Sequence, residues 1–587
     1  MKYMKKISLL FLSFLMAITL VGCQPDNKEV QKKFDEFIQK QFVETMESDY
    51  TTAHVYLVKP EDFGIDSKKI KVNLGERITE ENIQKNKKEQ AAVLKELKSF
   101  NRDQLTDEQK DTYDIFLFDA QINEKMNDDK FDYYQQLFES MTGLHYQLPT
   151  MLTDWQLRNE QDVKDLITLV NDIKPYMDSA LDYTKKQQAK GFLMCDLDSV
   201  IEYCDGIIKN GKESAILESM KKSIDNLSLD QNQSNEYKKQ LEKAFLDSFI
   251  PAYENIRNSM KDFKSQKNNT DGLAQFKNGK EYYELLLQKN CGSHKSVDDI
   301  KKMMKIAFNN HFKKLIAVAT KDPNLINEEE PKTGFKNYSE ILDHIQNNFS
   351  NDFPEVKNMS YHIEDINKEI ASSSGVAAYF NIPPLDGTDK KQLRVNPNTA
   401  NISSLSTYQT VAHEGYPGHM YQYAYMYENQ NSPYRKSLAN SNAYAEGYAV
   451  YSQYYAHKYL KNINKNYLEL MKENELASYC IIIVADIGIH YEGWGFNEFK
   501  DYLISQGFDL GNDEDFKKQF YQLQANPAAF EPYYVGYEEF MSLKDNAQKK
   551  LGDKFKDKDF HTAILKSGLA PFSVVEKNVK EYIESQK

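Results

Sequence analysis

The sequence predicts a mainly α-helical protein with one small β-hairpin or sheet. Most of its first half repeats apolar residues at three- and four-residue spacing among Lys, Glu, Asp and Gln, as amphipathic helices do. Around residues 375–396 this pattern gives way to alternation, which is typical of strands. A chain of 587 residues, 40% of them hydrophobic, is long enough to bury a large core.

The chain opens with a targeting segment. Residues 1–22 have a basic start, an apolar stretch and small residues before Cys23, and Leu20-Val21-Gly22-Cys23 resembles a bacterial lipobox. We expect a lipoprotein signal peptide over residues 1–22 and a lipid on Cys23. That lipid would anchor an extracytoplasmic protein to the cell membrane or outer surface. Ordinary signal cleavage with an unmodified Cys23 is the alternative.

Residues 23–350 are expected to form a helical N-terminal region. Within it, Thr106 and Gln109 have the spacing of a capping box at the start of a helix. The apolar stripe of that helix would consist of Tyr113, Phe116, Leu117 and Ala120.

Residues 351–587 have a different pattern of residues and are expected to form a separate, catalytic region that contains the metal site. Five of the eleven histidines fall between His362 and His490, so candidate ligands are concentrated here. A Pro-Pro-Leu-Asp-Gly turn separates two runs of alternating residues, which predicts a short hairpin beside the histidine segment. The alternating residues are Val376, Ala378, Phe380, Leu393 and Val395. Helical spacing resumes after the histidines.

The net charge narrows the possible partners. The formal charge is -14, and loss of three leader lysines with the signal peptide makes it -14 - 3 = -17. So acidic a chain argues against nucleic acid as a partner. Beyond the leader no segment is apolar for long enough to span a bilayer. Four cysteines remain, namely Cys195, Cys204, Cys291 and Cys480. They could form disulfides or be buried as free thiols, and Cys480 has a core-like context.

The strongest chemical signal is the run H-E-G-Y-P-G-H at residues 413–419. In the zinc-binding pattern H-E-x-x-H, the second histidine follows the first by one helical turn, but Pro417 occupies that position. His419 comes six residues after His413, which on a regular helix would leave the side chains roughly 120° apart. A break at Pro417 and Gly418 could return His419 to the face of His413. The alternative is a histidine pair that only packs around a helix end.

Two later segments add candidate residues. Glu446 lies in a segment of small and aromatic residues, where an unpaired buried carboxylate would be unfavourable and a metal would offset that cost. Its neighbours Ala445 and Gly447 suggest close packing; an exposed glutamate is the alternative. Asp486 and His490 are four residues apart, so Asp486 could orient His490 and leave one ring nitrogen free as a donor. A structural pair would have the same spacing.

Five motifs in this order resemble one family, the bacterial "domain of unknown function 885" proteins. They are the 413–419 run followed by Gln422, A-E-G-Y at 445–448, D-x-G-x-H at 486–490 with Gly493-Trp494, Y-Y-V-G-Y at 533–537, and Phe560-His561 with Gly568. Members of that family are often lipoproteins and are similar to glutamate-liganded zinc metallopeptidases. The resemblance therefore implies a large helical metallopeptidase-like fold with the β-hairpin or sheet beside the active-site helix.

The resemblance also implies a role for each motif residue. His413, His419 and Glu446 would bind Zn²⁺, and Glu414 would act as the general base. His490 and a tyrosine of the 533–537 run, Tyr533 or Tyr537, would stabilise the oxyanion. Asp486 and Gln453 would hold these residues in position. The chain departs from the family at two positions, with Met420 where a histidine is common and Gln453 where a glutamate is common.

These expectations support a surface-anchored zinc-dependent metallopeptidase that hydrolyses peptide bonds. A substrate peptide could add to the hairpin at residues 375–396 as a further strand. Two alternatives use the same residues: a zinc-dependent amidase or esterase acting on cell-envelope material, and a non-catalytic lipoprotein that binds peptides. The presence of Glu414 beside His413 favours catalysis, because binding alone needs no base there.

Overall fold

A computed structural model describes residues 27–194, 196–266, 268–374, 376–387, 390–399 and 401–586. The predicted signal peptide, Cys23 and Cys195 lie outside these residues. The described cysteines Cys204, Cys291 and Cys480 are buried free thiols, as the core-like context of Cys480 predicted.

The first half is helical, as predicted, and its helices form two groups. The first group comprises α2 (Asn27–Ser48), α3 (Tyr50–Tyr56), α4 (Glu80–Leu97) and α5 (Asp107–Met126). The second comprises α6 (Leu144–Asp154), α7 (Glu160–Ala189), α8 (Leu197–Asn210), α9 (Ala215–Asp225), α10 (Gln231–Ala244) and α11 (Ile250–Lys264). The expected capping box begins α5, where Thr106 and Gln109 exchange side-chain and backbone hydrogen bonds.

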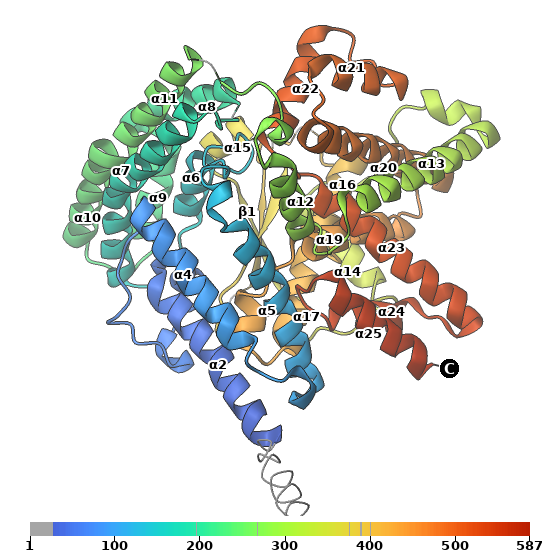
Figure 1. Cartoon of the computed structure of the whole chain (residues 1–587), viewed down its shortest axis with the longest axis horizontal. Coiled ribbons are helices and arrows are strands. Elements are labelled where there is room, and N and C mark those ends of the chain that lie inside the picture. Colours follow the sequence, from blue (N-terminus) through green and yellow to red (C-terminus); the bar gives the residue numbers. More distant parts are fainter. Residues whose placement is uncertain are drawn as a thin grey trace, which may run out of the picture.

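The rest of the chain is also helical and carries the sheet. Before and within the sheet region lie α12 (Gly279–Asn290), α13 (Val297–Lys321), α14 (Tyr338–Asn348) and α15 (Lys368–Ser374). After it come α16 (Leu405–Glu414), α17 (His419–Asn429), α18 (Pro433–Ser437), α19 (Asn442–Tyr455) and α20 (Lys465–Ile487). The last helices are α21 (Phe496–Ser505), α22 (Asp513–Ala525), α23 (Glu531–Leu551), α24 (Asp557–Leu565) and α25 (Phe572–Ser585). In Figure 1, α7–α11 form one side of the molecule and α20–α25 the other.

The sheet confirms the predicted hairpin and adds a strand. Strands β2 (Ala378–Asn381) and β3 (Lys391–Val395) pair antiparallel, with Ala378 opposite Val395. Strand β1 (Tyr361–Asp365) pairs with β3 in parallel, which gives the order β1-β3-β2. Strand β2 is thus an edge strand, and it contacts α16.

Buried residues from both halves form the largest hydrophobic core. It includes Tyr283 and Met304 from the first half, and Tyr408 and Tyr444 from the second. A second core lies within the first half and centres on α7 and α11. A third packs α2 and α5 of the first half against Tyr434 and other residues of the second half. The division at residue 350 stays a prediction about chain organisation, because the largest core extends across it.

Two glycines allow α19 and α23 to approach each other closely. A Cβ atom added to Gly447 would lie 2.5 Å from the Cα atom of Gly536, and one added to Gly536 would lie 2.3 Å from the carbonyl oxygen of Ala443. Neither separation is possible for real side chains, so the helices meet backbone to backbone. The small residues predicted beside Glu446 do mark close packing.

A buried charged group joins α13, α20 and α23. The ring Nδ1 of His311 lies 2.6 Å from Glu473, and its Nε2 lies 2.7 Å from Glu538. Burial alone would lower the pKa of His311, but the two glutamates outweigh burial and raise it to about 8. His311 therefore carries a proton at neutral pH and links the three helices.

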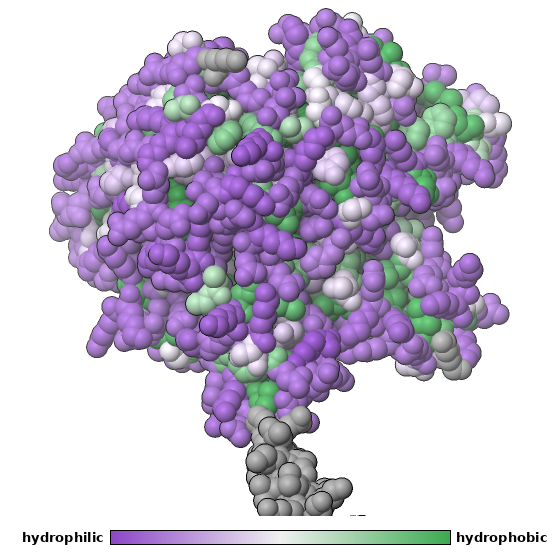
Figure 2. Space-filling view, viewed as in Figure 1, coloured by the Kyte–Doolittle hydropathy of each residue, from purple (hydrophilic) through white to green (hydrophobic). Residues whose placement is uncertain are grey.

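The visible surface is mostly hydrophilic (Figure 2). Exposed large hydrophobic residues gather on the outer part of α13 and just after it, namely Ile306, Phe312, Ile316 and Ile326. Among the described residues, no helix is both long enough and apolar enough to cross a membrane.

Replacing Gly447 with alanine should destabilise the fold. The new Cβ must displace the backbone of α23, an overpacking that typically costs about 1–3 kcal/mol. Urea unfolding measures the loss. Gly206→Ala on α8 is a matched control, because a Cβ there meets nothing within 4 Å and alanine favours the helix by up to about 1 kcal/mol. Equal stability of Gly447→Ala and the wild type would contradict the close approach.

The protonated His311 should make stability depend on pH. Because its folded pKa of about 8 exceeds the unfolded value of 6.5, its stabilisation is complete below pH 6.5 and is lost as the pH rises through 8. That shift corresponds to roughly 2 kcal/mol. Unfolding free energies of the wild type and His311→Gln between pH 6 and 9 isolate this contribution. The surface variant His362→Gln should keep the wild-type slope; a wild-type slope in His311→Gln would refute the assignment.

Candidate metal centre

The helix that carries His413 breaks where the sequence predicted. Helix α16 ends at Glu414, a cis Tyr416-Pro417 bond follows, and α17 begins at His419. A Cβ atom on Gly418 would lie 1.8 Å from the carbonyl oxygen of His413, so only glycine fits at this turn. The hydroxyl of Tyr448 donates to the carbonyl oxygen of Pro417 over 3.0 Å and fixes the turn to α19.

The break brings both histidines to one carboxylate. The ring centroids of His413 and His419 are 4.9 Å apart, with the rings nearly perpendicular. The Nε2 atoms of His413 and His419 lie 3.3 and 3.4 Å from Oε2 of Glu446. Candidate ligand atoms of these three residues all lie within 4.8 Å of one another. The three residues predicted as ligands are thus together.

A glutamine orients each histidine. Nδ1 of His413 lies 3.0 Å from Oε1 of Gln453, and Nδ1 of His419 lies 3.4 Å from Oε1 of Gln422. An amide oxygen only accepts hydrogen bonds, so each Nδ1 carries the proton in these contacts. Each Nε2 lone pair of a neutral ring is then free for a metal, the arrangement usual for metal-binding histidines.

The spacing of these atoms fits a zinc ion. Zinc ligands lie about 2.0–2.1 Å from the ion in a tetrahedron, which places neighbouring ligand atoms about 3.3–3.4 Å apart. The separations of the two Nε2 atoms from Glu446 have these values. Two nitrogens and one carboxylate oxygen are also a common donor set for catalytic zinc.

Glu414 lies beside this group and is held by the sheet. Its Oε1 is 3.9 Å from Nε2 of His413, and its Oε2 accepts a hydrogen bond from the backbone N–H of Phe380 on β2 over 3.0 Å. Strand β2 therefore positions the carboxylate predicted to be the general base.

The two candidate tyrosines are in different places. The ring of Tyr533 stacks on that of His413 with centroids 6.3 Å apart, and Tyr533 lines the chamber described below. Burial, and then the charges of Glu446 and Glu414, raise the pKa of its phenol, which keeps it a hydrogen-bond donor. Tyr537 is buried against Tyr454 and does not line the chamber, so the structure favours Tyr533.

The prediction for His490 and Asp486 requires correction. His490 is fully buried; its Nδ1 accepts from the backbone N–H of Leu273, and its Nε2 donates to the carbonyl oxygen of Leu523. No ring nitrogen is left for a substrate. Oδ2 of Asp486 accepts from the Tyr283 hydroxyl and the Ala528 N–H, and its Oδ1 lies 3.6 Å from Nε2 of His490. The two residues thus join the end of α20 to α12 and the segment before it, to α22, and to the loop before α23, which takes up their hydrogen-bonding capacity.

The electrostatics of the three candidate ligands favour a bound cation. Burial would lower the pKa of His419, but Glu446 outweighs burial and raises it to about 9. Burial would raise the pKa of Glu446, but the two histidines hold it well below its usual range. Without a metal, the carboxylate thus favours a proton on His419. A divalent cation would take that proton's place.

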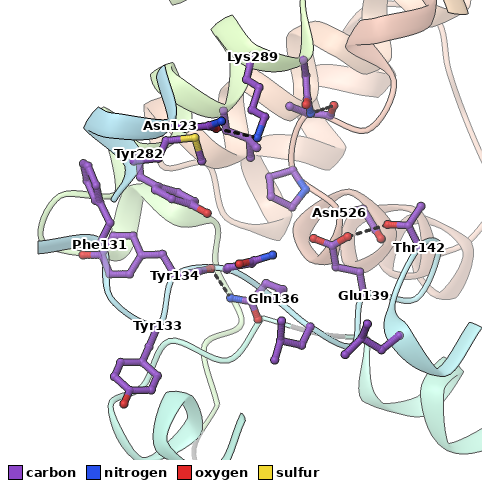
Figure 3. A pocket seen from close by; sticks show the side chains of 18 of the residues that line it. Asn123, Phe131, Tyr133, Tyr134, Gln136, Glu139, Thr142, Tyr282, Lys289 and Asn526 are labelled. Atoms are coloured by element: carbon purple, nitrogen blue, oxygen red, sulfur yellow. Dashed lines mark hydrogen bonds between the residues drawn. The ribbon is translucent and has the colours of Figure 1, made fainter. Parts of the chain in front are cut away.

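A large chamber opens beside the site. It has a volume of about 1210 Å³ and is lined by α4, α5, α7, α12 and residues 131–147 of the first half, and by residues 526–534 of the second. Glu446 and Tyr533 line it as well. Glu446 is the most accessible of the three candidate ligands, with 25% of its side chain exposed against 11% for His413 and 12% for His419. Figure 3 shows part of the wall.

Three features of the site were not predicted. Gln422 was noted without a role, although it lies one helical turn after His419 and so could have been expected to reach it. The contact between Phe380 and Glu414, and the chamber itself, depend on long-range packing. No local sequence signal indicates either of them.

The sequence matches the family described as "Bacterial protein of unknown function (DUF885)" over residues 62–579. A search of curated proteins gave no match. A predicted lipoprotein from Colwellia psychrerythraea shares the fold with a TM-score of 0.80 at 17% identity, over 95% of this chain and 99% of that one. A predicted lipoprotein of unknown function from Shewanella oneidensis gives 0.60 at 14%, over 86% and 93%. Identities this low show the fold alone.

A predicted oligoendopeptidase F from Bacillus anthracis str. Ames gives a TM-score of 0.31 at 10% identity, over 85% of this chain and 95% of that one. That likeness is too weak to carry a conclusion about fold or chemistry.

Replacing Gln453 with leucine should weaken zinc binding. The substitution removes the acceptor for Nδ1 of His413, and loss of such a partner typically lowers metal affinity by about 10- to 100-fold. Competition with a chromophoric chelator measures the affinity. Gln430→Leu is a matched control, because Gln430 is as buried as Gln453 but donates to Lys566, away from the site. Unchanged affinity in Gln453→Leu would show that the ring needs no such support.

Proposed function

The chain belongs to the DUF885 family of bacterial proteins, and we propose that it is a zinc-dependent metallopeptidase. The observation that carries the proposal is the convergence of the two Nε2 atoms on Glu446 at zinc-ligand spacing, with Glu414 alongside. The proposed ligands are His413, His419 and Glu446. A zinc ion held there would supply Lewis acidity and lower the pKa of a nearby water.

The positions of the residues around the ligands support a mechanism of peptide hydrolysis. Glu414 takes a proton from the attacking water and passes it to the leaving amine. Tyr533 donates its phenolic hydrogen to the carbonyl oxygen as negative charge develops there, the role that the sequence predicted for His490 together with Tyr533 or Tyr537. Gln453 and Gln422 keep the two imidazoles in one orientation throughout.

We propose that the substrate is an extended peptide. Strand β2 is an edge strand and contacts Glu414 through Phe380, so a peptide added to that edge would pass close to the proposed base. The chamber would receive the part of the substrate that lies beyond Glu446 and Tyr533.

We also propose that the protein works outside the cytoplasm on a lipid anchor at Cys23. The lipobox-like sequence supports this location. Helix α2 begins at Asn27, four residues later, so the tether between lipid and fold would be short.

Glu414→Gln should abolish peptide hydrolysis while leaving zinc bound. Glutamine preserves the shape and can still accept the Phe380 hydrogen bond, but it cannot take up the proton; loss of a general base typically lowers kcat by about 10²- to 10⁴-fold. Zinc content, by elemental analysis, and cleavage of a random peptide library, by mass spectrometry, test both statements. Glu428→Gln on α17, whose carboxylate accepts from Lys357 and Asn358, serves as the control.

Each result has a distinct meaning. Full activity in Glu414→Gln would refute the mechanism. A zinc-loaded wild type that cleaves no peptide but cleaves envelope fragments would favour an amidase or esterase. A protein that binds no zinc at all would favour a peptide-binding lipoprotein.

A further inference from the structure

The charged side chains of the chamber wall are paired, with one exception among the carboxylates. Each pair lies within the described part of the chain: Glu76 with Lys85, Arg77 with Asp172, Glu80 with Lys186, Lys87 with Asp132, and Glu446 with the two histidines. Lys289 donates to Asn123. The exception is Glu139, which has no lysine, arginine or histidine within ion-pair distance among the residues that the structure describes.

Glu139 lies on the segment between α5 and α6 and is half-buried. Its Oε2 accepts a hydrogen bond from the hydroxyl of Thr142 over 2.8 Å. Figure 3 shows the carboxylate beside Thr142 and Asn526 on the chamber wall. A half-buried carboxylate with one neutral donor and no cation beside it is harder to ionise than one in water, and burial raises the pKa of Glu139. A cation from outside would offset that cost.

The chamber that Glu139 lines suits an ammonium group. Tyr282 lines the same chamber, and burial, followed by the charge of Glu139, raises the pKa of its phenol. Tyr282 also packs edge-on against Tyr134 and contacts Phe131, so this part of the wall is aromatic. An ammonium ion is stabilised both by a carboxylate and by the faces of aromatic rings. A neutral or anionic group would gain neither interaction.

We propose that Glu139 binds a primary ammonium group of the substrate and so selects peptides that carry one in the chamber. This inference rests on the proposed peptidase function, because Glu446 and Tyr533 line the same chamber. Glu139 would determine specificity and take no part in bond cleavage. Two sources supply the same chemistry, a free amino terminus and the side chain of lysine or a related diamino acid.

The test measures which peptides bind to the full-length chain that carries Glu414→Gln. This variant is used because it should bind peptides without cleaving them. The probe is a library of random pentapeptides, prepared with free and with acetylated amino termini. Peptides retained on ultrafiltration are identified by mass spectrometry. We expect free-terminus peptides, or acetylated peptides that contain lysine, to be enriched roughly tenfold or more over acetylated peptides without lysine. Which of the two sets is enriched identifies the source of the ammonium group.

Adding Glu139→Gln should remove this enrichment. Glutamine retains an acceptor for Thr142, and thermal unfolding checks that the variant folds. Glu76→Gln is the matched control: it also neutralises a carboxylate on the chamber wall, but one that is already paired with Lys85, so the enrichment should remain.

Equal retention of all three peptide sets, or enrichment that survives Glu139→Gln, would overturn the inference. These outcomes are separate from failure of the proposed function. A wild type that cleaves no peptide while its Glu414→Gln form keeps the Glu139-dependent selectivity would refute only the peptidase.

Discussion

The contact between Gly447 and Gly536 is the constraint on which the proposed site depends. Glu446 precedes the first glycine on α19, and Tyr533 lies one turn before the second on α23. Because the helix backbones touch at this crossing, the carboxylate and the phenol come to the same place. A side chain at either position would separate the helices and move Glu446 away from the histidines. At this crossing no side chains pack between the two helices, and the close contact of the backbones fixes the positions of Glu446 and Tyr533 relative to each other.

The turn between α16 and α17 has a complementary role. Regular helix would direct His413 and His419 to different sides, whereas the break lets both reach Glu446. Glutamines on α17 and α19 then fix the rings, and β2 holds Glu414. Three elements thus restrict the rotation of three polar side chains. Such restriction is what a preorganised polar site requires, since the groups need not reorganise when a ligand binds.

The sequence was sufficient to predict the features that depend on local patterns. The capping box of α5, the hairpin of β2 and β3, the break at Pro417-Gly418 and the close packing beside Glu446 are all present. The error at His490 has a physical cause. The spacing of Asp486 and His490 indicates a shared helix face but not what lies opposite, and Leu273 and Leu523 take both ring nitrogens. Strand β1, the Phe380 contact and the chamber depend on residues far apart in the sequence.

The chamber wall has a consequence for how members of this family can differ. The proposed ligands and base lie between residues 413 and 446, whereas most of the opposing wall, including Glu139, comes from residues 76–147 and 176–183. The proposed reacting groups and the proposed selectivity residue are therefore encoded in separate stretches of one chain. Substitutions in the first half can change which ligand is accepted without altering the reacting groups. Under the proposed function, the helical first half would be free to diverge in sequence with the ligand it binds, while the second half keeps the reacting groups.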